Sequence, residues 1–103
     1  MRRDPIEHEV KIWPEYYAQV SVRIKPFELR KAERDYRPGD MLLLRVFDPI
    51  AKRYTGESGR ARIQTVLKDA PGLMHGYVAL GIFFIGRAFV QPIEDDYDLN
   101  ELH

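Results

Sequence analysis

Residues 23–37 combine six cationic side chains with three acidic ones, so this short stretch is locally basic. Arginine presents a planar fork of donors to a phosphate and lysine a mobile point charge, while aromatics such as Tyr17 and Tyr36 can stack on unpaired bases. The pattern predicts a site for a short single-stranded RNA or one nucleotide. The residues predicted to contact such a ligand are Tyr17, Lys25, Glu28, Arg30, Lys31 and Arg34.

Glu28 has more than one interpretation. It lies two residues before Arg30, on the same face of a strand, so it could read a base edge or orient Arg30. In the structural alternative, Glu28 and Arg30 only pair with neighbours at the surface. Lys25 and Glu28 could also do general acid–base work if burial shifted their proton affinities. They are therefore the candidate catalytic residues if the protein is an enzyme.

Other chemistries lack the residues that they need. The chain has no cysteine, and His8, His75 and His103 show no paired spacing, so we expect no metal site. No glycine-rich phosphate loop occurs, and we expect no cofactor. We expect no membrane partner, because no apolar run could cross a bilayer. The first residues lack the apolar stretch of a secretory signal, so we expect a cytoplasmic location.

The elements that must position these residues follow from the periodicity of the sequence. Residues 14–22 begin with Pro and Glu, as a first helical turn favours, and we expect Trp13 and Tyr16 to anchor this short helix in the core. Residues 77–85 are almost continuously apolar, which predicts a central strand buried on both faces. The other predicted strands are residues 8–12, 25–30, 41–47 and 60–68, with a polar hairpin connection at residues 54–59.

One helix among about five strands predicts a small α+β domain with a curved or closed antiparallel sheet. A turn is predicted at residues 37–40, because Pro38 presets one backbone angle and Gly39 accepts a positive φ. The residues predicted to fill the core are Leu42, Leu44, Ile63, Leu67, Leu80 and Ile82.

Charge is segregated along the chain although the formal net charge is zero. All 16 Lys and Arg lie in residues 1–92 together with 11 of the 16 acidic residues, so this part carries +5 and the rest −5. The sequence predicts a domain at residues 1–86 and an acidic tail or appendage at residues 87–103. This tail could mediate a homodimer, or compete with an anionic ligand for the basic body.

Three separated motifs resemble one known family. They are Lys-Pro-Phe-Glu-Leu-Arg-Lys at residues 25–31 with the Pro-Gly-Asp turn at 38–40, His-Glu-Val-Lys-Ile at 8–12, and Pro-Gly-Leu at 71–73 ahead of Gly-Tyr-Val at 76–78. In order and spacing they are similar to the ASCH-domain proteins of the PUA-like superfamily, in particular a short branch common in phages and bacteria. The resemblance covers residues 8–85. It implies a small PUA-like antiparallel β-barrel with one or two short helices, and an RNA-binding cleft lined by residues 25–34.

The resemblance also implies a second possible activity and shows departures from the family. Some ASCH-type proteins resemble amidohydrolases that act on an acylated nucleoside such as N4-acetylcytidine, using a lysine, a hydroxyl and a carboxylate; Lys25 matches the lysine. Pro26 replaces the usual Thr and removes its hydroxyl, and Arg23 replaces a Gly, so we expect Arg23 to avoid positive φ. A non-catalytic protein-interaction adaptor is the third function class that stays open.

Overall fold

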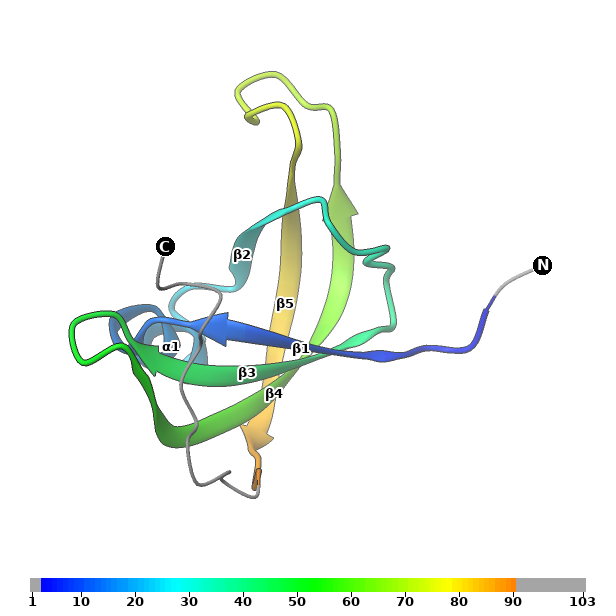
Figure 1. Cartoon of the computed structure of the whole chain (residues 1–103). Helices are drawn as coiled ribbons and strands as arrows, with labels where there is room; N and C mark the ends of the chain where they lie inside the picture. Colours follow the sequence, from blue (N-terminus) through cyan, green and yellow to red (C-terminus); the bar gives the residue numbers. More distant parts are fainter. Residues whose placement is uncertain (1–2, 91–103) are drawn as a thin grey trace.

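The computed structural model describes residues 3–90, which form one sheet and one helix (Figure 1). The helix α1 is too short and too polar to cross a membrane. The predicted tail lies largely outside the described residues, and so does any homodimer contact made through it. The elements are β1 (Glu7–Ile12), α1 (Pro14–Ser21), β2 (Phe27–Lys31), β3 (Met41–Asp48), β4 (Arg53–Leu67) and β5 (Tyr77–Arg87).

The five strands form a mixed sheet in the order β1-β3-β4-β5-β2. Figure 1 shows that the sheet curls: the first part of β4 lies alongside β3, and β4 then bends to run beside β5. The predicted small α+β fold with a curved sheet is therefore confirmed. The expectation of a purely antiparallel sheet is wrong, because β1 pairs with β3 in parallel. The long crossover through α1 and β2 returns the chain in the same direction, which a hairpin cannot do.

The two edge strands of the curled sheet are linked by a side chain. Arg30 on β2 donates a hydrogen bond from Nη1 to the backbone oxygen of Lys11 on β1, at 2.8 Å. The sheet therefore bends far enough for its first and last strands to come within the reach of one arginine. This seam between β1 and β2 is where the predicted site residues lie.

The core fills the inner face of the sheet. Five of the six predicted core residues are fully or almost fully buried: Leu42, Leu44, Ile63, Leu80 and Ile82. Leu67 is the exception, because it is 53% exposed. Ile63 pairs with Ile82 but Thr65 pairs with Gly81, so β4 carries one extra residue there. This β-bulge reverses the alternation, and Val66 rather than Leu67 packs against the core.

Two strand predictions need correction. The predicted hairpin connection at residues 54–59 belongs to β4, and the chain turns earlier, where the Asp48 carboxylate accepts hydrogen bonds from the backbone N–H groups of Ile50 and Ala51. Thr55, Gly56 and Glu57 are exposed positions of this strand, whereas Ser58 is buried. β5 is an interior strand, as predicted, but only its inner face is buried, since Phe83 and Ile85 are half-exposed.

The helix α1 faces the core with Tyr17 and Val20, not with Tyr16 as predicted. It ends in a Schellman motif, in which Arg23 N–H bonds to the Val20 oxygen and Ile24 N–H to the Gln19 oxygen. Arg23 takes a φ of +62° there, so the expectation that it avoids positive φ is wrong. Its guanidinium is held by the Phe84 backbone oxygen at 2.9 Å and lies over the Phe83 ring.

Candidate functional site

A pocket of about 450 Å³ opens at the seam between β1, the start of α1 and β2. Apolar and aromatic side chains form most of its wall, and three charged side chains of the predicted site join them. The lining residues are Ile12, Trp13, Tyr16, Lys25, Phe27, Glu28, Leu29 and Arg30. Concave, mostly apolar sites with a few convergent polar groups are typical of small-ligand binding.

Charged residues line the inner face of β2. Glu28 and Arg30 pair across the sheet with Leu80 and Val78, whose side chains are buried, so both charged side chains point to the inner side of the sheet. The apolar Leu29 faces outward and is more than half exposed. A closed core would exclude such charges, because an unpaired buried charge is costly. The open side of the curled sheet, where the pocket lies, makes this arrangement possible.

The Glu28 carboxylate is held between two cations. Lys25 Nζ lies 3.0 Å from Glu28 Oε1, and Arg30 Nη1 lies 3.3 Å from Glu28 Oε2. Glu28 is only 6% exposed, so the interpretation of a surface ion pair is wrong for this residue. The structure thus brings together three of the six predicted ligand-contacting residues. It also places both candidate catalytic residues, Lys25 and Glu28, in direct contact.

Aromatic rings flank this charged group. Trp13 and Tyr16 are each more than 40% exposed, and their rings stack with centroids 5.9 Å apart. Lys25 Nζ lies 4.8 Å from the centroid of Tyr16 and 5.4 Å from that of Phe27. These cation–π contacts fix the lysine beside the pocket. The prediction that Trp13 and Tyr16 are core anchors is therefore wrong, and both are available to stack on a ligand.

Tyr17 does not reach the pocket. It is 6% exposed, its ring meets Phe84 edge to face, and its hydroxyl donates a hydrogen bond to the backbone oxygen of Ser58 at 3.2 Å. Burial raises the pKa of the Tyr17 phenol above its ordinary value of 10.0, which keeps this donor neutral. Tyr36 is also buried, against His8. The prediction of both residues as stacking platforms is corrected: in α1 the exposed ring belongs to Tyr16.

Lys31 and Arg34 lie beside the pocket rather than in it. They line a second, more polar hollow of about 350 Å³ together with Glu33, Tyr36 and Tyr77. Leu29 and Arg30 line both hollows, so the two are adjacent. Lys31 and Arg34 are exposed. The six predicted residues thus divide into a pocket group, a neighbouring cationic pair and the buried Tyr17.

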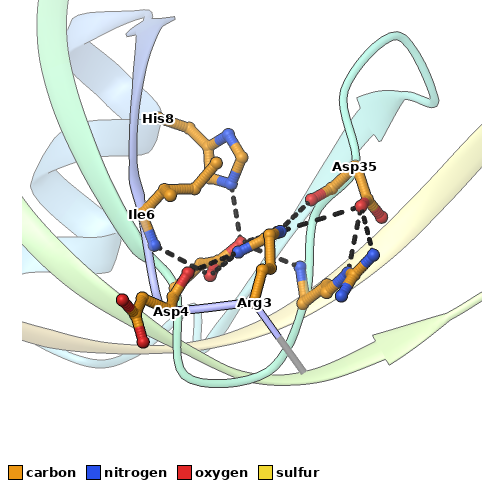
Figure 2. A network of polar contacts seen from close by, with 7 residues as sticks. Arg3, Asp4, Ile6, His8 and Asp35 are labelled. Carbon is orange, nitrogen blue, oxygen red and sulfur yellow. Dashed lines mark hydrogen bonds and ion pairs between the residues drawn. The ribbon is translucent and has the colours of Figure 1, made fainter. Parts of the chain in front are cut away.

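A second polar group, which the sequence did not predict, surrounds Asp40 in the turn before β3. Figure 2 shows the Arg3 and His8 side chains converging on this carboxylate. Arg3 donates to both carboxylate oxygens, at 2.8 and 2.7 Å, and His8 Nε2 lies 2.8 Å from Oδ2. The backbone N–H groups of Ile6 and Arg37 donate as well. The only sequence signal was the Gly-Asp turn, because Arg3 and His8 lie more than 30 positions away.

This network is structural. The Arg3 guanidinium, with help from His8 and the two backbone donors, holds the pKa of the Asp40 carboxyl well below its ordinary value of 3.8, although burial acts in the opposite direction. An ionised carboxylate only accepts hydrogen bonds, so His8 Nε2 carries a proton. His8 itself is buried beside this carboxylate. In residues 3–90 no three His, Cys, Asp or Glu side chains are grouped to hold a metal ion.

Comparison with known proteins gives a family without an assigned activity. No curated protein matches the chain. Residues 7–82 match the family described as Domain of unknown function (DUF3850). The match begins at the first residue of β1 and ends within β5, so it includes the pocket together with Asp40, His8 and Arg37, whereas Arg3 and Ile6 of the Asp40 network precede it. Because this match covers well over half of the chain, the protein belongs to the DUF3850 family.

Proposed function

We propose that the protein is an RNA- or nucleotide-binding module whose site is the pocket between β1, α1 and β2. The observation that carries this proposal is the carboxylate of Glu28, buried and held between Lys25 and Arg30, beside exposed aromatic rings. Such a site offers hydrogen-bonding groups for the edge of a base and ring surfaces for its face. Stacking of a base on an aromatic side chain contributes about 1–3 kcal/mol to binding.

The neighbouring cationic pair suits the backbone of the same ligand. Lys31 and Arg34 are exposed and line the hollow next to the pocket, with Arg30 common to both. A base in the pocket would therefore place its sugar and phosphate within the reach of these two cations. The pocket itself is less suited to a phosphate, because Glu28 already balances one of its two positive charges.

The fold type is part of the proposal. We infer that the curled five-stranded sheet and its helix form a PUA-like barrel of the ASCH type. The resemblance of residues 8–85 to that family supports this assignment, and the curled five-stranded sheet with one short helix is compatible with it. A cleft beside β2 is also where the resemblance implies that RNA binds.

The test is a titration of a short fluorescent single-stranded RNA at several salt concentrations. The unchanged protein should bind, and Arg34→Ala should weaken binding and reduce the slope of log K against log salt by about 0.7, the value for one lost phosphate contact on a single strand. Arg62→Ala is the control, because Arg62 is an exposed cation of β4 that lines neither hollow. Absence of RNA binding, or equal losses for both variants, would reject the proposal and favour an adaptor.

An amidohydrolase is the second candidate, favoured by the 3.0 Å contact of Lys25 with Glu28 in the pocket. Glu28 would take a proton from water as the water oxygen adds to the acyl carbon, and Lys25 would stabilise the developing oxyanion. When the C–N bond breaks, Glu28 would return that proton to the leaving N4 amine of cytidine. The amidohydrolase scheme that the resemblance implies also uses a hydroxyl, and the described pocket-lining residues include no Ser or Thr, so binding is the better-supported function. Release of acetate and cytidine from N4-acetylcytidine, lost in Glu28→Gln, would establish the enzyme.

A further inference from the structure

We propose that the pocket reads the edge of uracil or thymine, the two bases that carry a pyrimidine-2,4-dione ring. This inference rests on the proposed function and adds the identity of the base. It starts from the arrangement of the three charged groups. Lys25 donates to one oxygen of the Glu28 carboxylate and Arg30 to the other, so each carboxylate oxygen has its own cationic donor.

Across the pocket the groups therefore present donor, acceptor and donor, in the order Lys25, Glu28, Arg30. Uracil and thymine present the complementary order on their pairing edge: the O4 acceptor, the N3–H donor and the O2 acceptor. Cytosine presents one donor followed by two acceptors, and guanine one acceptor followed by two donors, so each complements only some of the three groups Lys25, Glu28 and Arg30, which we call the row. Adenine has an acceptor at the central position, where Glu28 needs a donor. A site whose buried polar groups would be left unpaired by the wrong base discriminates strongly.

Each group keeps hydrogen-bonding capacity for a ligand. A carboxylate has about four acceptor positions, and within residues 3–90 each oxygen of Glu28 accepts one hydrogen bond. Both contacts of Arg30 with this part of the chain use Nη1, which leaves Nη2 and Nε as donors. Lys25 uses one of its three N–H groups on Glu28. The row can therefore bind a base without giving up its own ion pairs.

The row is also preorganised. Arg30 is fixed from behind by the backbone oxygen of Lys11, and Lys25 lies against the rings of Tyr16 and Phe27. Donors that are already held in place lose little side-chain entropy when a ligand binds. The same rings give the base a surface on which to stack, so edge and face recognition come from one group of residues.

The test changes the ligand and leaves the protein as it is. Short oligomers of uridine, cytidine and 3-methyluridine, and of thymidine, are compared in equilibrium titrations. Uridine and thymidine oligomers should bind about tenfold more tightly than cytidine, as expected for one well-placed base-edge contact. The 3-methyluridine oligomer, which lacks only the N3–H donor and cannot approach Glu28, should be weakened at least as much. Equal binding of uridine and thymidine would show that neither the sugar nor the 5-methyl group is read. Thymidine binding no more tightly than cytidine would contradict recognition of the edge that the two bases share.

A variant supplies the second measurement. Glu28→Gln keeps the shape of the side chain but offers an amide in place of the central acceptor, so the ratio of uridine to cytidine affinity should fall toward one. Melting temperature is recorded to confirm that the variant is folded, with Arg62→Ala as the control. Equal affinity for all oligomers, with loss in Arg34→Ala, would overturn the base assignment but leave the RNA-binding proposal standing. No binding of any oligomer would overturn both.

Discussion

Tyr16 and Tyr17 are adjacent residues of α1 with opposite environments. Tyr16 is 43% exposed beside the pocket, whereas Tyr17 lies in the core with its hydroxyl bonded to Ser58. A helix turns by about 100° per residue, so a one-residue difference in phase exchanges a ligand platform for a core anchor. In a helix of eight residues the apolar pattern is too short to fix this phase from the sequence.

We expect the two tyrosines to separate binding from stability. Tyr16→Ala should reduce RNA affinity by about 1–3 kcal/mol, the contribution of one stacked base, with little change in melting temperature. Tyr17→Phe should leave affinity unchanged and lower the free energy of unfolding by about 0.5–1.5 kcal/mol, because it removes one buried hydrogen bond. RNA titrations and urea unfolding of both variants check this. The opposite pattern would show that the pocket has been placed on the wrong side of α1.

Asp40 is the residue whose charge should matter most for stability. Its pKa is lowered in the folded protein, first by Arg3, so the ionised form stabilises the fold at pH values above the ordinary 3.8. This contribution is lost as the pH falls from that value toward the lower folded-state pKa. Asp40→Asn should therefore cost about 2–4 kcal/mol at pH 7, since it removes the negative charge that Arg3 binds and replaces one of the two acceptor oxygens with an NH2 donor.

The difference in free energy of unfolding between the wild-type protein and Asp40→Asn should be smaller at pH 3 than at pH 7. Glu33→Gln is the matched control, because Glu33 is exposed and its charge should have little effect at either pH. If Asp40→Asn were as stable as the unchanged chain at pH 7, the network would not hold the N-terminal segment against the turn.

At the scale of elements, the end of α1 depends on a conformation that few residues accept. Arg23 closes the Schellman motif at a φ of +62°, in the left-handed region that favours glycine. Its side chain gains contacts with the Phe84 backbone oxygen and the Phe83 ring, which offset the strain. These contacts fix the segment that leads from the helix to Lys25 and hence to the pocket.

Arg23→Gly and Arg23→Ala should differ although both lose these contacts. Glycine relieves the backbone strain and alanine does not, so the Gly variant should be the more stable of the two by about 1–2 kcal/mol. Thermal and urea unfolding of both variants measure this difference. Equal stability would mean that Arg23 does not hold the left-handed conformation in solution.

The bulge in β4 makes a second prediction for the elements. Leu44 is fully buried in β3, so Leu44→Ala should cost about 2–5 kcal/mol. Leu67 follows the bulge on the outer face, so Leu67→Ala should cost less than about 1 kcal/mol. The matched pair is compared by urea unfolding. Equal costs would show that the alternation of β4 continues without a bulge and that Leu67 faces the core.

These elements show which parts of the structure a sequence can predict. Alternation placed Glu28 and Arg30 on one face of a strand, and it placed Leu42 and Leu44 in the core, because these are local properties of a regular strand. The bulge after Ile63 could not be predicted, since one extra residue leaves no signal in composition. The Arg3–His8–Asp40 network could not be predicted either, because it depends on the parallel pairing of β1 with β3.

At the scale of the whole molecule, the curl of the sheet creates the site. β1 and β2 are opposite edges in the strand order, and the curl brings them close enough for Arg30 to bond to Lys11. The pocket therefore needs the complete sheet, although Lys25, Glu28 and Arg30 are close in sequence. The described pocket residues come from β1, the start of α1 and the segment from Lys25 through β2.

The central claim, that RNA binds in this pocket, is tested most directly by mapping backbone amide shifts in the NMR spectrum of labelled protein as a uridine-rich single-stranded RNA is added at low salt. The predicted result is a saturable set of shifts at Trp13, Tyr16, Lys25 and residues 27–31, extending to Arg34. Residues on the outer face of β4 around Arg62 should stay unchanged. Shifts confined to that outer face, or no shifts at saturating RNA, would contradict the account.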